Sequence, residues 1–253
     1  GPKPQPNSAM SFYDGKTILI TGGAGGIGIE TARVFLDAGA LVRLVDVSAC
    51  GLARATRDLA AGMRLEAHLS DLADLQKCVA SLDSGPMPYA IVHLAGISLP
   101  DLDDLADLSR FDATMSANVR NGYQLARVFH ERHAGTAELP SRIVFASSLA
   151  YRRGGFDRIA YSAAKGAIAG MVRSMARRFA PTVLVNAVAP GIVLTPMTTA
   201  LIADRHETLM REIPIRRFAE PREVATVIEF LCGPASSYVN GQIINIDGGT
   251  VHS

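Results

Sequence analysis

Short apolar runs rich in β-branched residues alternate along the chain with longer segments of helical pattern. Alternation of this kind is typical of a parallel sheet whose consecutive strands are joined by right-handed crossover helices. It predicts an α/β fold: one doubly wound domain on a seven-stranded parallel sheet, with helices on both faces. Such sheets bind ligands beyond the carboxyl ends of their strands, where the strand order reverses.

The chain has 253 residues, enough for one full core, and shows neither an internal repeat nor a composition shift that would mark a second domain. We expect strands at residues 17–21, 41–46, 64–68, 90–94, 142–147, 182–188 and 243–246. We expect helices at residues 27–38, 52–61, 72–82, 111–133, 160–180 and 222–231. Residues 195–221 have no regular pattern and are expected to form a lid, while residues 1–9 are expected to be an added or disordered tail before a domain at 10–253.

Composition and charge argue against several classes of protein. The hydrophobic content is 48% and the formal net charge is +1, so neither disorder nor a nucleic-acid partner is expected. No apolar run is long enough to span a bilayer and no signal segment is recognisable, so we expect a cytoplasmic protein without a membrane partner. Cys50, Cys78 and Cys232 are widely spaced, which favours neither a disulfide framework nor a metal site.

A glycine-rich turn, Thr-Gly-Gly-Ala-Gly-Gly-Ile-Gly at residues 21–28, follows the first expected strand and opens the first expected helix. Glycines let the backbone approach a phosphate, and a helix N-terminus offers unpaired amides and positive dipole. The context therefore predicts a dinucleotide pyrophosphate site.

Asp46 ends the second expected strand, where a carboxylate can accept both hydroxyls of an adenine ribose and would repel a 2′-phosphate. No Arg or Lys stands beside it in the sequence, so NAD is favoured over NADP. The alternative is a capping role for the next helix.

Tyr161 and Lys165 are four residues apart, which places both on one face of a helix. An ammonium one turn away favours the phenolate, so we expect the pKa of Tyr161 to be lowered. Ser148 lies thirteen residues upstream, at the end of the fifth expected strand.

Together these motifs resemble the short-chain dehydrogenase/reductase family, and the resemblance covers nearly all of residues 14–250. It implies a Rossmann domain and hydride transfer between a nicotinamide cofactor and a small-molecule alcohol or ketone. The catalytic group implied is Asn118, Ser148, Tyr161 and Lys165. Ser148 would orient the substrate oxygen, Tyr161 would transfer the proton, Lys165 would hold the nicotinamide ribose, and Asn118 would position a relay water.

The resemblance also implies a set of cofactor contacts. Val193 would bond the carboxamide through its backbone, Pro190 would pack on the nicotinamide ring, and the exposed ring face would transfer the pro-S hydride. The full set expected to bind the cofactor is Thr21, Gly22, Gly26, Ile27, Gly28, Asp46, Asp71, Leu72, Ala95, Gly96, Tyr161, Lys165, Pro190, Gly191, Val193 and Thr195. For Asp71, a helix cap is a serious alternative.

His93 and Leu94 depart from the family pattern, because they stand where the family usually has two asparagines. We expect His93 to be a structural group rather than a catalytic base, and cofactor binding to survive the change. Asn121 is the weaker candidate for the role given to Asn118.

The substrate is left open by the sequence. Arg152, Arg153 and Arg158 precede Tyr161, and Arg211, Arg216 and Arg217 lie near the lid, so an anionic group could be bound, although a solvated rim is the simpler interpretation. The main hypothesis is an NAD-dependent secondary-alcohol dehydrogenase. The alternatives are a 3-oxoacyl-thioester reductase and a non-catalytic dinucleotide sensor. The resemblance also implies a homotetramer, with the helices at 111–133 and 160–180 pairing across a two-fold axis.

Overall fold

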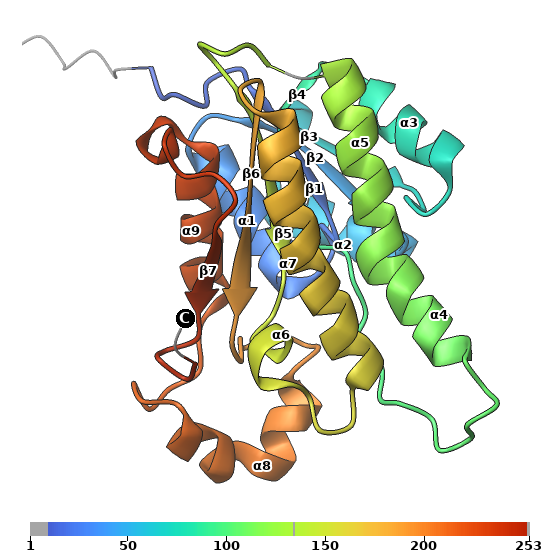
Figure 1. Ribbon diagram of the computed structural model, residues 1–253. Helices are drawn as coiled ribbons and strands as arrows, with labels where there is room; N and C mark the ends of the chain where they lie inside the picture. Colours follow the sequence, from blue (N-terminus) through green and yellow to red (C-terminus); the bar gives the residue numbers. More distant parts are fainter. Residues whose placement is uncertain (1–9, 134, 252–253) are drawn as a thin grey trace, which may run out of the picture.

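Seven parallel strands form one sheet in the order β3-β2-β1-β4-β5-β6-β7, in a computed structural model that describes residues 10–133 and 135–251 (Figure 1). The strands are β1 (Thr17–Thr21), β2 (Leu41–Asp46), β3 (Leu65–Leu69), β4 (Pro88–His93), β5 (Ser141–Ala146), β6 (Val183–Pro190) and β7 (Ile243–Ile246). The prediction of a doubly wound, seven-stranded parallel sheet is confirmed. The expected tail at residues 1–9 lies outside the described residues.

Helices cover both faces of this sheet. They are α1 (Gly26–Asp37), α2 (Ala49–Leu59), α3 (Leu75–Asp83), α4 (Ser109–Met115), α5 (Asn121–His133), α6 (Ala150–Arg153), α7 (Ile159–Phe179), α8 (Thr199–Glu212) and α9 (Pro221–Cys232). Three short turns complete the described structure: 3₁₀ turns η1 (Gly62–Arg64) and η3 (Pro234–Ser236), and the π-helical turn η2 (Ser116–Arg120). None of the described helices is both long and apolar enough to cross a bilayer.

The core lies in two layers, because alternate residues of each strand point to opposite faces of the sheet. Ile18 and Ile20 of β1 pack in the layer beneath α1, α2 and α9, whereas Leu19 packs in the layer beneath α3, α5 and α7. All three side chains are fully buried. With both faces covered in this way, polar chemistry is confined to the ends of the strands.

Side-chain caps explain where two helices start. Ser48 caps α2 by accepting from the Gly51 amide at 3.1 Å, so this helix begins three residues before the expected position 52. Asp74 caps α3 by accepting from the Lys77 amide at 3.1 Å, so this helix begins three residues after the expected position 72. Apolar periodicity alone misses both starts because the caps are polar residues.

The expectation that residues 195–221 are irregular is wrong, since α8 occupies most of this segment. Non-helical backbone angles at Arg205 kink α8, which weakens the periodic pattern that would reveal it. Figure 1 shows α6 and α8 together, beyond the ends of β6 and β7 toward which the strand arrows point. The short helix α6 was not expected either.

Arg43 lies on β2 and is fully buried. Its guanidinium donates to Glu66 Oε2 at 3.1 Å and to the carbonyl oxygens of Ser81, Leu82 and Pro86 at 3.0–3.3 Å. It therefore closes the C-terminal end of α3 against the sheet, where helix carbonyls have no partner within the helix.

Replacing Arg43 by Met should lower the free energy of unfolding by about 2–4 kcal/mol, because several buried carbonyls would lose their donor. Urea denaturation measures the change. Arg57→Ala is the control, since the Arg57 side chain is 75% exposed and pairs with its sequence neighbour Asp58. Equal stability of the two variants would contradict the structural role of Arg43.

Candidate active site

The glycine-rich turn between β1 and α1 is shaped by contacts that leave no room for side chains. Gly22 has a positive φ of +64°, and a Cβ there would lie 2.8 Å from the Ala95 amide nitrogen. A Cβ on Gly28 would lie 2.3 Å from the Gly22 carbonyl oxygen. Gly25 stands at the N-cap of α1 without a side chain to cap it, so the amides of the first turn face outward for an anion.

Asp46 holds this turn against the end of β2. Its Oδ2 accepts from the Ala24 amide and its Oδ1 from the Ser48 amide, both at 3.0 Å. Ser48, not Asp46, supplies the cap of α2, so the capping alternative for Asp46 does not hold. Asp46 also lines a cavity beside the turn.

Two cavities meet at Gly22 and bring together most of the expected cofactor residues. One, of about 150 Å³, is lined by Thr21, Gly22, Asp46, Asp71, Leu72, Ala95 and Gly96, among others. The other, of about 200 Å³, is lined by Gly22, Gly26, Ile27, Gly28, Pro190 and Thr195, among others. Together they form an elongated cleft along the carboxyl ends of β1, β2, β4 and β6.

The segment after β6 closes one side of this cleft. A Cβ on Gly26 would lie 2.9 Å from Thr195 Cγ2, so Thr195 packs directly on the glycine turn. Val193 is buried and its carbonyl accepts from the Thr198 hydroxyl. A Cβ on Gly191 would lie 3.0 Å from the Cα of Asp247, so Gly191 packs closely on that backbone. Neither Gly191 nor Val193 is among the residues that line the two cavities.

Tyr161 and Lys165 lie one turn apart near the start of α7, with Lys165 Nζ 5.4 Å from the centre of the Tyr161 ring. The Lys165 side chain is buried, and its Nζ donates to the Ala146 carbonyl at the end of β5 at 3.0 Å. Burial lowers the pKa of Lys165 to about 8.

The expectation of a lowered pKa for Tyr161 is wrong for the protein alone. Burial raises the pKa of the phenol, while a hydrogen bond with Ser148 and the charge of Arg158 act in the opposite direction. Desolvation of the phenolate is the larger effect, so the net shift is upward. The spacing of Tyr161 and Lys165 is right for a shared face, but it carries no information on burial.

The two serines at the end of β5 have different surroundings. Ser147 is buried and donates to the Lys165 carbonyl at 2.9 Å, which ties β5 to α7. Ser148 faces the phenol of Tyr161 and also accepts from the Ala150 amide at 3.2 Å. Ser148 is therefore the serine that the structure brings to Tyr161.

Asn118 lies in η2, the π-helical turn that separates α4 from α5 within the single helix expected at 111–133. Its Nδ2 donates to the carbonyls of Ile97 and Thr114, both at 2.9 Å. Its Oδ1 is buried without a partner among the described residues and points at Gly96, whose added Cβ would lie 2.3 Å from it and 3.4 Å from Lys165 Nζ. An acceptor and an ammonium thus converge on one small space.

Asn121 is used differently. Its Nδ2 donates to the Ala117 carbonyl at 2.8 Å and its Oδ1 accepts from the Gly122 amide at 2.7 Å, so both ends of its amide serve the helix backbone. Between the two asparagines, Asn118 is the one aimed at Lys165.

His93 is buried, and its Nδ1 lies 2.8 Å from Thr21 Oγ1, which also accepts from the Ala95 amide at 3.2 Å. Burial lowers the pKa of His93 to about 3, so the ring is neutral at physiological pH and unsuited to acid–base chemistry there. The structure thus supports the structural interpretation of this departure, with a histidine–threonine link joining β1 to β4.

Comparisons with known proteins agree with this geometry. A family model described as "Enoyl-(Acyl carrier protein) reductase" matches residues 22–251. The acetoacetyl-CoA reductase of Synechocystis sp. is 33% identical over 241 residues, covering 92% of this chain and 95% of the relative. The chain belongs to the short-chain dehydrogenase/reductase family.

Other members of the family show how widely the substrates of similar proteins differ. The cis-4-hydroxycyclohexanecarboxylate dehydrogenase of Sinomonas cyclohexanicum is 36% identical over 243 residues, covering 92% of this chain and 96% of the relative. A solved structure described as a glucose/ribitol dehydrogenase, from Brucella melitensis, superposes with a TM-score of 0.90 at 30% identity, covering 97% of this chain and 100% of that one. Membership therefore establishes an oxidoreductase fold and chemistry without naming the substrate.

Sequence reasoning missed one basic side chain of this short-chain dehydrogenase/reductase. Arg54 of α2 lines the cofactor cleft and its Nη2 donates to the Ala24 carbonyl at 3.3 Å. It stands eight residues after Asp46, so it is absent from the immediate sequence neighbourhood. Helical spacing is the pattern that could have revealed it. Gly51, three residues earlier, is buried against Ala24, so residues three positions apart on α2 share the face that points at the turn.

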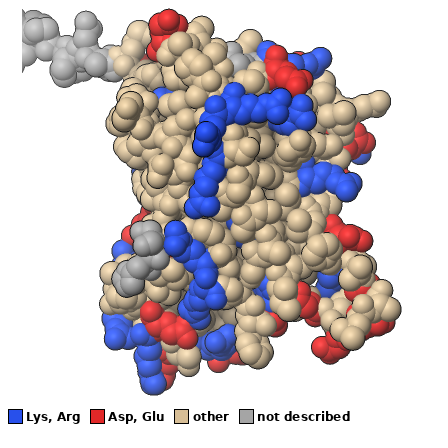
Figure 2. All heavy atoms as spheres, viewed as in Figure 1, with Lys and Arg blue, Asp and Glu red and all other residues tan. Residues whose placement is uncertain are grey.

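The arginines near the expected lid are engaged with neighbouring groups. Arg153 of α6 pairs with Glu212 of α8 at 2.7 Å, Arg211 pairs with Glu207, and Arg158 pairs with Asp157. Arg152 donates to the Tyr151 hydroxyl and Arg216 to the Arg211 carbonyl, both at 2.7 Å. In the lower part of Figure 2, basic groups accordingly stand beside acidic ones.

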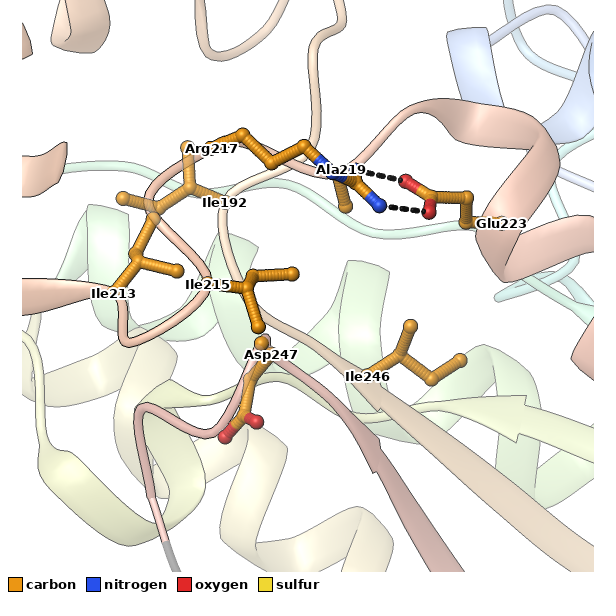
Figure 3. A pocket seen from close by; sticks show the side chains of 9 residues that line it. Ile192, Ile213, Ile215, Arg217, Ala219, Glu223, Ile246 and Asp247 are labelled. Atoms are coloured by element: carbon orange, nitrogen blue, oxygen red, sulfur yellow. Dashed lines mark hydrogen bonds and ion pairs between the residues drawn. The ribbon is translucent and has the colours of Figure 1, made fainter.

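Arg217 belongs to a separate, small cavity of about 70 Å³, which lies between the segment after α8 and the end of β7 (Figure 3). Both ends of its guanidinium bond the carboxylate of Glu223, at 2.6 and 2.7 Å, and isoleucine side chains from Ile192, Ile213, Ile215 and Ile246 line the space. None of the expected catalytic side chains lines this cavity, so we assign it no part in the reaction.

Lys165→Met should abolish turnover yet raise the free energy of unfolding at pH 7 by about 1–3 kcal/mol, because burying the ammonium costs the folded state. The folded-state pKa lies below the unfolded value, so wild-type stability rises as the pH passes from about 8 toward 10.5, and the advantage of Met should shrink there. Urea unfolding at pH 7 and pH 9.5 measures this. Lys77→Met, on an exposed position of α3, is the control. A variant less stable than wild type at pH 7 would contradict the burial cost.

Proposed function

We propose that this protein interconverts a secondary alcohol and a ketone, with NAD as the preferred hydride carrier and Tyr161 as the proton donor and acceptor. The observation that carries the proposal is the convergence of Ser148, Tyr161 and Lys165 at the end of β5, beside a cleft that begins at the glycine turn. A nucleotide sensor would not need this group. We therefore favour an enzyme over a sensor.

The residues present fit a dinucleotide. The close contacts at Gly22 and Gly28 make a cradle that a Cβ would fill, the first turn of α1 offers amides to the pyrophosphate, and Asp46 offers a carboxylate to the adenine ribose. When bound, the nicotinamide supplies or accepts the hydride. Lys165 would hold the nicotinamide ribose, and the backbone around Pro190 and Val193 would fix the ring.

The protein groups then handle the proton. Ser148 donates a hydrogen bond to the substrate oxygen and orients it toward Tyr161. In reduction the Tyr161 phenol gives its proton to that oxygen, and in oxidation the phenolate takes it. Because burial raises the pKa of Tyr161, the phenol holds its proton at neutral pH, which favours reduction there and makes alcohol oxidation rise with pH.

Proton resupply would run through the space between Lys165 Nζ and Asn118 Oδ1. The unpartnered Oδ1 is a buried acceptor of the kind that an ordered water satisfies, and a side chain at position 96 would collide with it. This supports the relay role proposed for Asn118.

Asp46 supports the preference for NAD, since a carboxylate in the ribose position repels a 2′-phosphate. Solved neighbours include a 3-ketoacyl-(acyl-carrier-protein) reductase complexed with NADH and a putative gluconate 5-dehydrogenase with bound NADP. Arg54, beside the same turn, is a cation that would attract a 2′-phosphate and so reduce the preference for NAD over NADP.

A 3-oxoacyl-thioester reductase is the second candidate. It is favoured by the acetoacetyl-CoA reductase relative, by the 3-oxoacyl-[acyl-carrier-protein] reductase of Thermotoga maritima at 32% identity, and by the description of the matching family model. Against it, the arginines around α6 and α8 are paired with carboxylates or neighbouring oxygens, whereas the exposed Met197 lines the cleft. We therefore favour an uncharged substrate of moderate polarity.

We further propose a cytoplasmic homotetramer in which α5 and α7 of neighbouring subunits pair. Gly166 and Gly170 of α7 have open space at their missing Cβ positions, which would let another helix approach. Light scattering of the purified protein tests the assembly.

Turnover is tested first with NAD and NADP against sugars, polyols, cyclic alcohols, hydroxy acids and acyl thioesters, followed at 340 nm. We expect turnover with NAD on one class of alcohol or ketone, and Tyr161→Phe should reduce kcat by at least about a thousandfold while NADH still binds, because the proton donor is lost. Fluorescence titration of NADH is the control for folding. Wild-type turnover in Tyr161→Phe would exclude Tyr161 as the proton donor.

Asp46→Ala should weaken NAD binding by about tenfold and narrow the ratio between NAD and NADP affinity, because both the ribose acceptor and the repulsion of a 2′-phosphate are removed. Isothermal titration with each nucleotide measures the ratio. Asp46→Asn is the matched control, because it keeps an acceptor oxygen but not the charge. An unchanged ratio in both variants would contradict the ribose assignment.

A further inference from the structure

The N-terminus of α7 is capped by a residue from a distant part of the chain. Arg158 stands at the N-cap position, and its side chain makes no cap hydrogen bond. Instead, Asp101 accepts from the Ile159 amide through Oδ2 at 2.6 Å and from the Ala160 amide through Oδ1 at 3.2 Å. These are the first two residues of α7, and Tyr161 is the third.

A backbone contact joins the same two segments. The Asp101 amide donates to the Asp157 carbonyl at 2.9 Å, just before α7. On the other side of Asp101, the Pro100 carbonyl accepts from Arg110 of α4 at 2.9 Å. The connection between β4 and α4 is thus fastened to the start of α7 by both oxygens of one carboxylate and by its own backbone.

A carboxylate is well suited to this position. The first amides of a helix have no partner within the helix, and the positive end of the helix dipole favours a negative charge. Hydrogen bonds from amides to an ionised carboxylate are also stronger than those to a neutral acceptor. The first turn of α7 therefore depends on Asp101 for its order.

The direction of the Tyr161 phenol follows from the order of that turn. One turn further on, Lys165 is fixed by its burial and by its bond to the Ala146 carbonyl. On the N-terminal side, Arg158 and Asp157, which pair with each other, flank the capped amides. Of the groups that act on Tyr161, Ser148 lies just after β5, but Arg158 belongs to the segment that Asp101 holds.

We propose that Asp101 is a positioning residue for proton transfer, which holds the first turn of α7 so that the Tyr161 phenol faces Ser148 and the substrate oxygen. The proposal rests on the proposed role of Tyr161 in catalysis. Asp101 does not touch the reacting atoms in this account; it acts through the backbone of Ile159 and Ala160.

The test compares Asp101→Ala and Asp101→Asn with wild type, and uses Asp103→Ala, an exposed position of the same connection, as the matched control. Three quantities are measured: hydrogen exchange of the Ile159 and Ala160 amides, kcat and KM with the NAD-linked substrate identified for the wild type, and the alkaline titration of Tyr161 by phenolate absorbance against a Tyr161→Phe background. NADH affinity is followed by fluorescence.

For Asp101→Ala we expect faster exchange at both amides, a fall in kcat of at least about tenfold, and KM and NADH affinity within about twofold of wild type. The Tyr161 titration should move to lower pH, because a loosened turn loses the burial that raises the pKa of the phenol. Asp101→Asn, which keeps one acceptor oxygen, should fall between Asp101→Ala and wild type, and Asp103→Ala should match wild type.

Faster exchange with kcat within twofold of wild type would overturn the proposal, since Asp101 would then be a structural cap alone. If Asp101→Ala does not fold, Asp101→Asn decides: a kcat equal to wild type overturns the proposal, and a loss of kcat at unchanged KM supports it. The exchange and titration measurements need no substrate. A wild type without turnover therefore contradicts the proposed function, while an unchanged Tyr161 titration contradicts the role of Asp101.

Discussion

The ammonium of Lys165 lies inside the protein, and several elements of the site are arranged around it. A cation there is costly because it has lost its water, and its pKa is lowered accordingly. A hydrogen bond to the Ala146 carbonyl, at the end of β5, replaces part of the lost interaction with water. Ser147 donates to the backbone carbonyl of Lys165 and so holds that residue in place. The π-helical turn then brings Asn118 Oδ1 toward the same space. The end of β5, the helix α7 and the π-helical turn η2 thus all lie close to Lys165 Nζ.

The sequence predicts the sheet well because a buried parallel strand leaves a local, apolar pattern. Three strands, at 17–21, 41–46 and 243–246, begin and end where expected. Helix starts were predicted less well, since Ser48 and Asp74 act through single hydrogen bonds that periodicity does not record. The kink at Arg205 hid α8 for a similar reason.

At the site, residue types and spacing predicted which side chains would meet, but not their energetics. Tyr161 and Lys165 share a face as their spacing requires, yet burial reverses the expected direction of the Tyr161 pKa. Contacts between residues far apart in the sequence could not be predicted either. Asp101 lies 58 residues before Ile159, and only the fold brings its carboxylate to α7. His93 likewise reveals its link to Thr21 only when β1 and β4 pair.

In the proposed function Asp46 combines two duties in one carboxylate, and this limits how cofactor preference can evolve. The same oxygens that would face a ribose already hold the amides of Ala24 and Ser48, so they keep the glycine turn and the start of α2 in place. A lineage that replaced Asp46 to accept a phosphorylated nucleotide would loosen the cradle in the same step. Such a switch of cofactor would first require a second support for the glycine turn. Arg54 already donates to the Ala24 carbonyl and could supply that support.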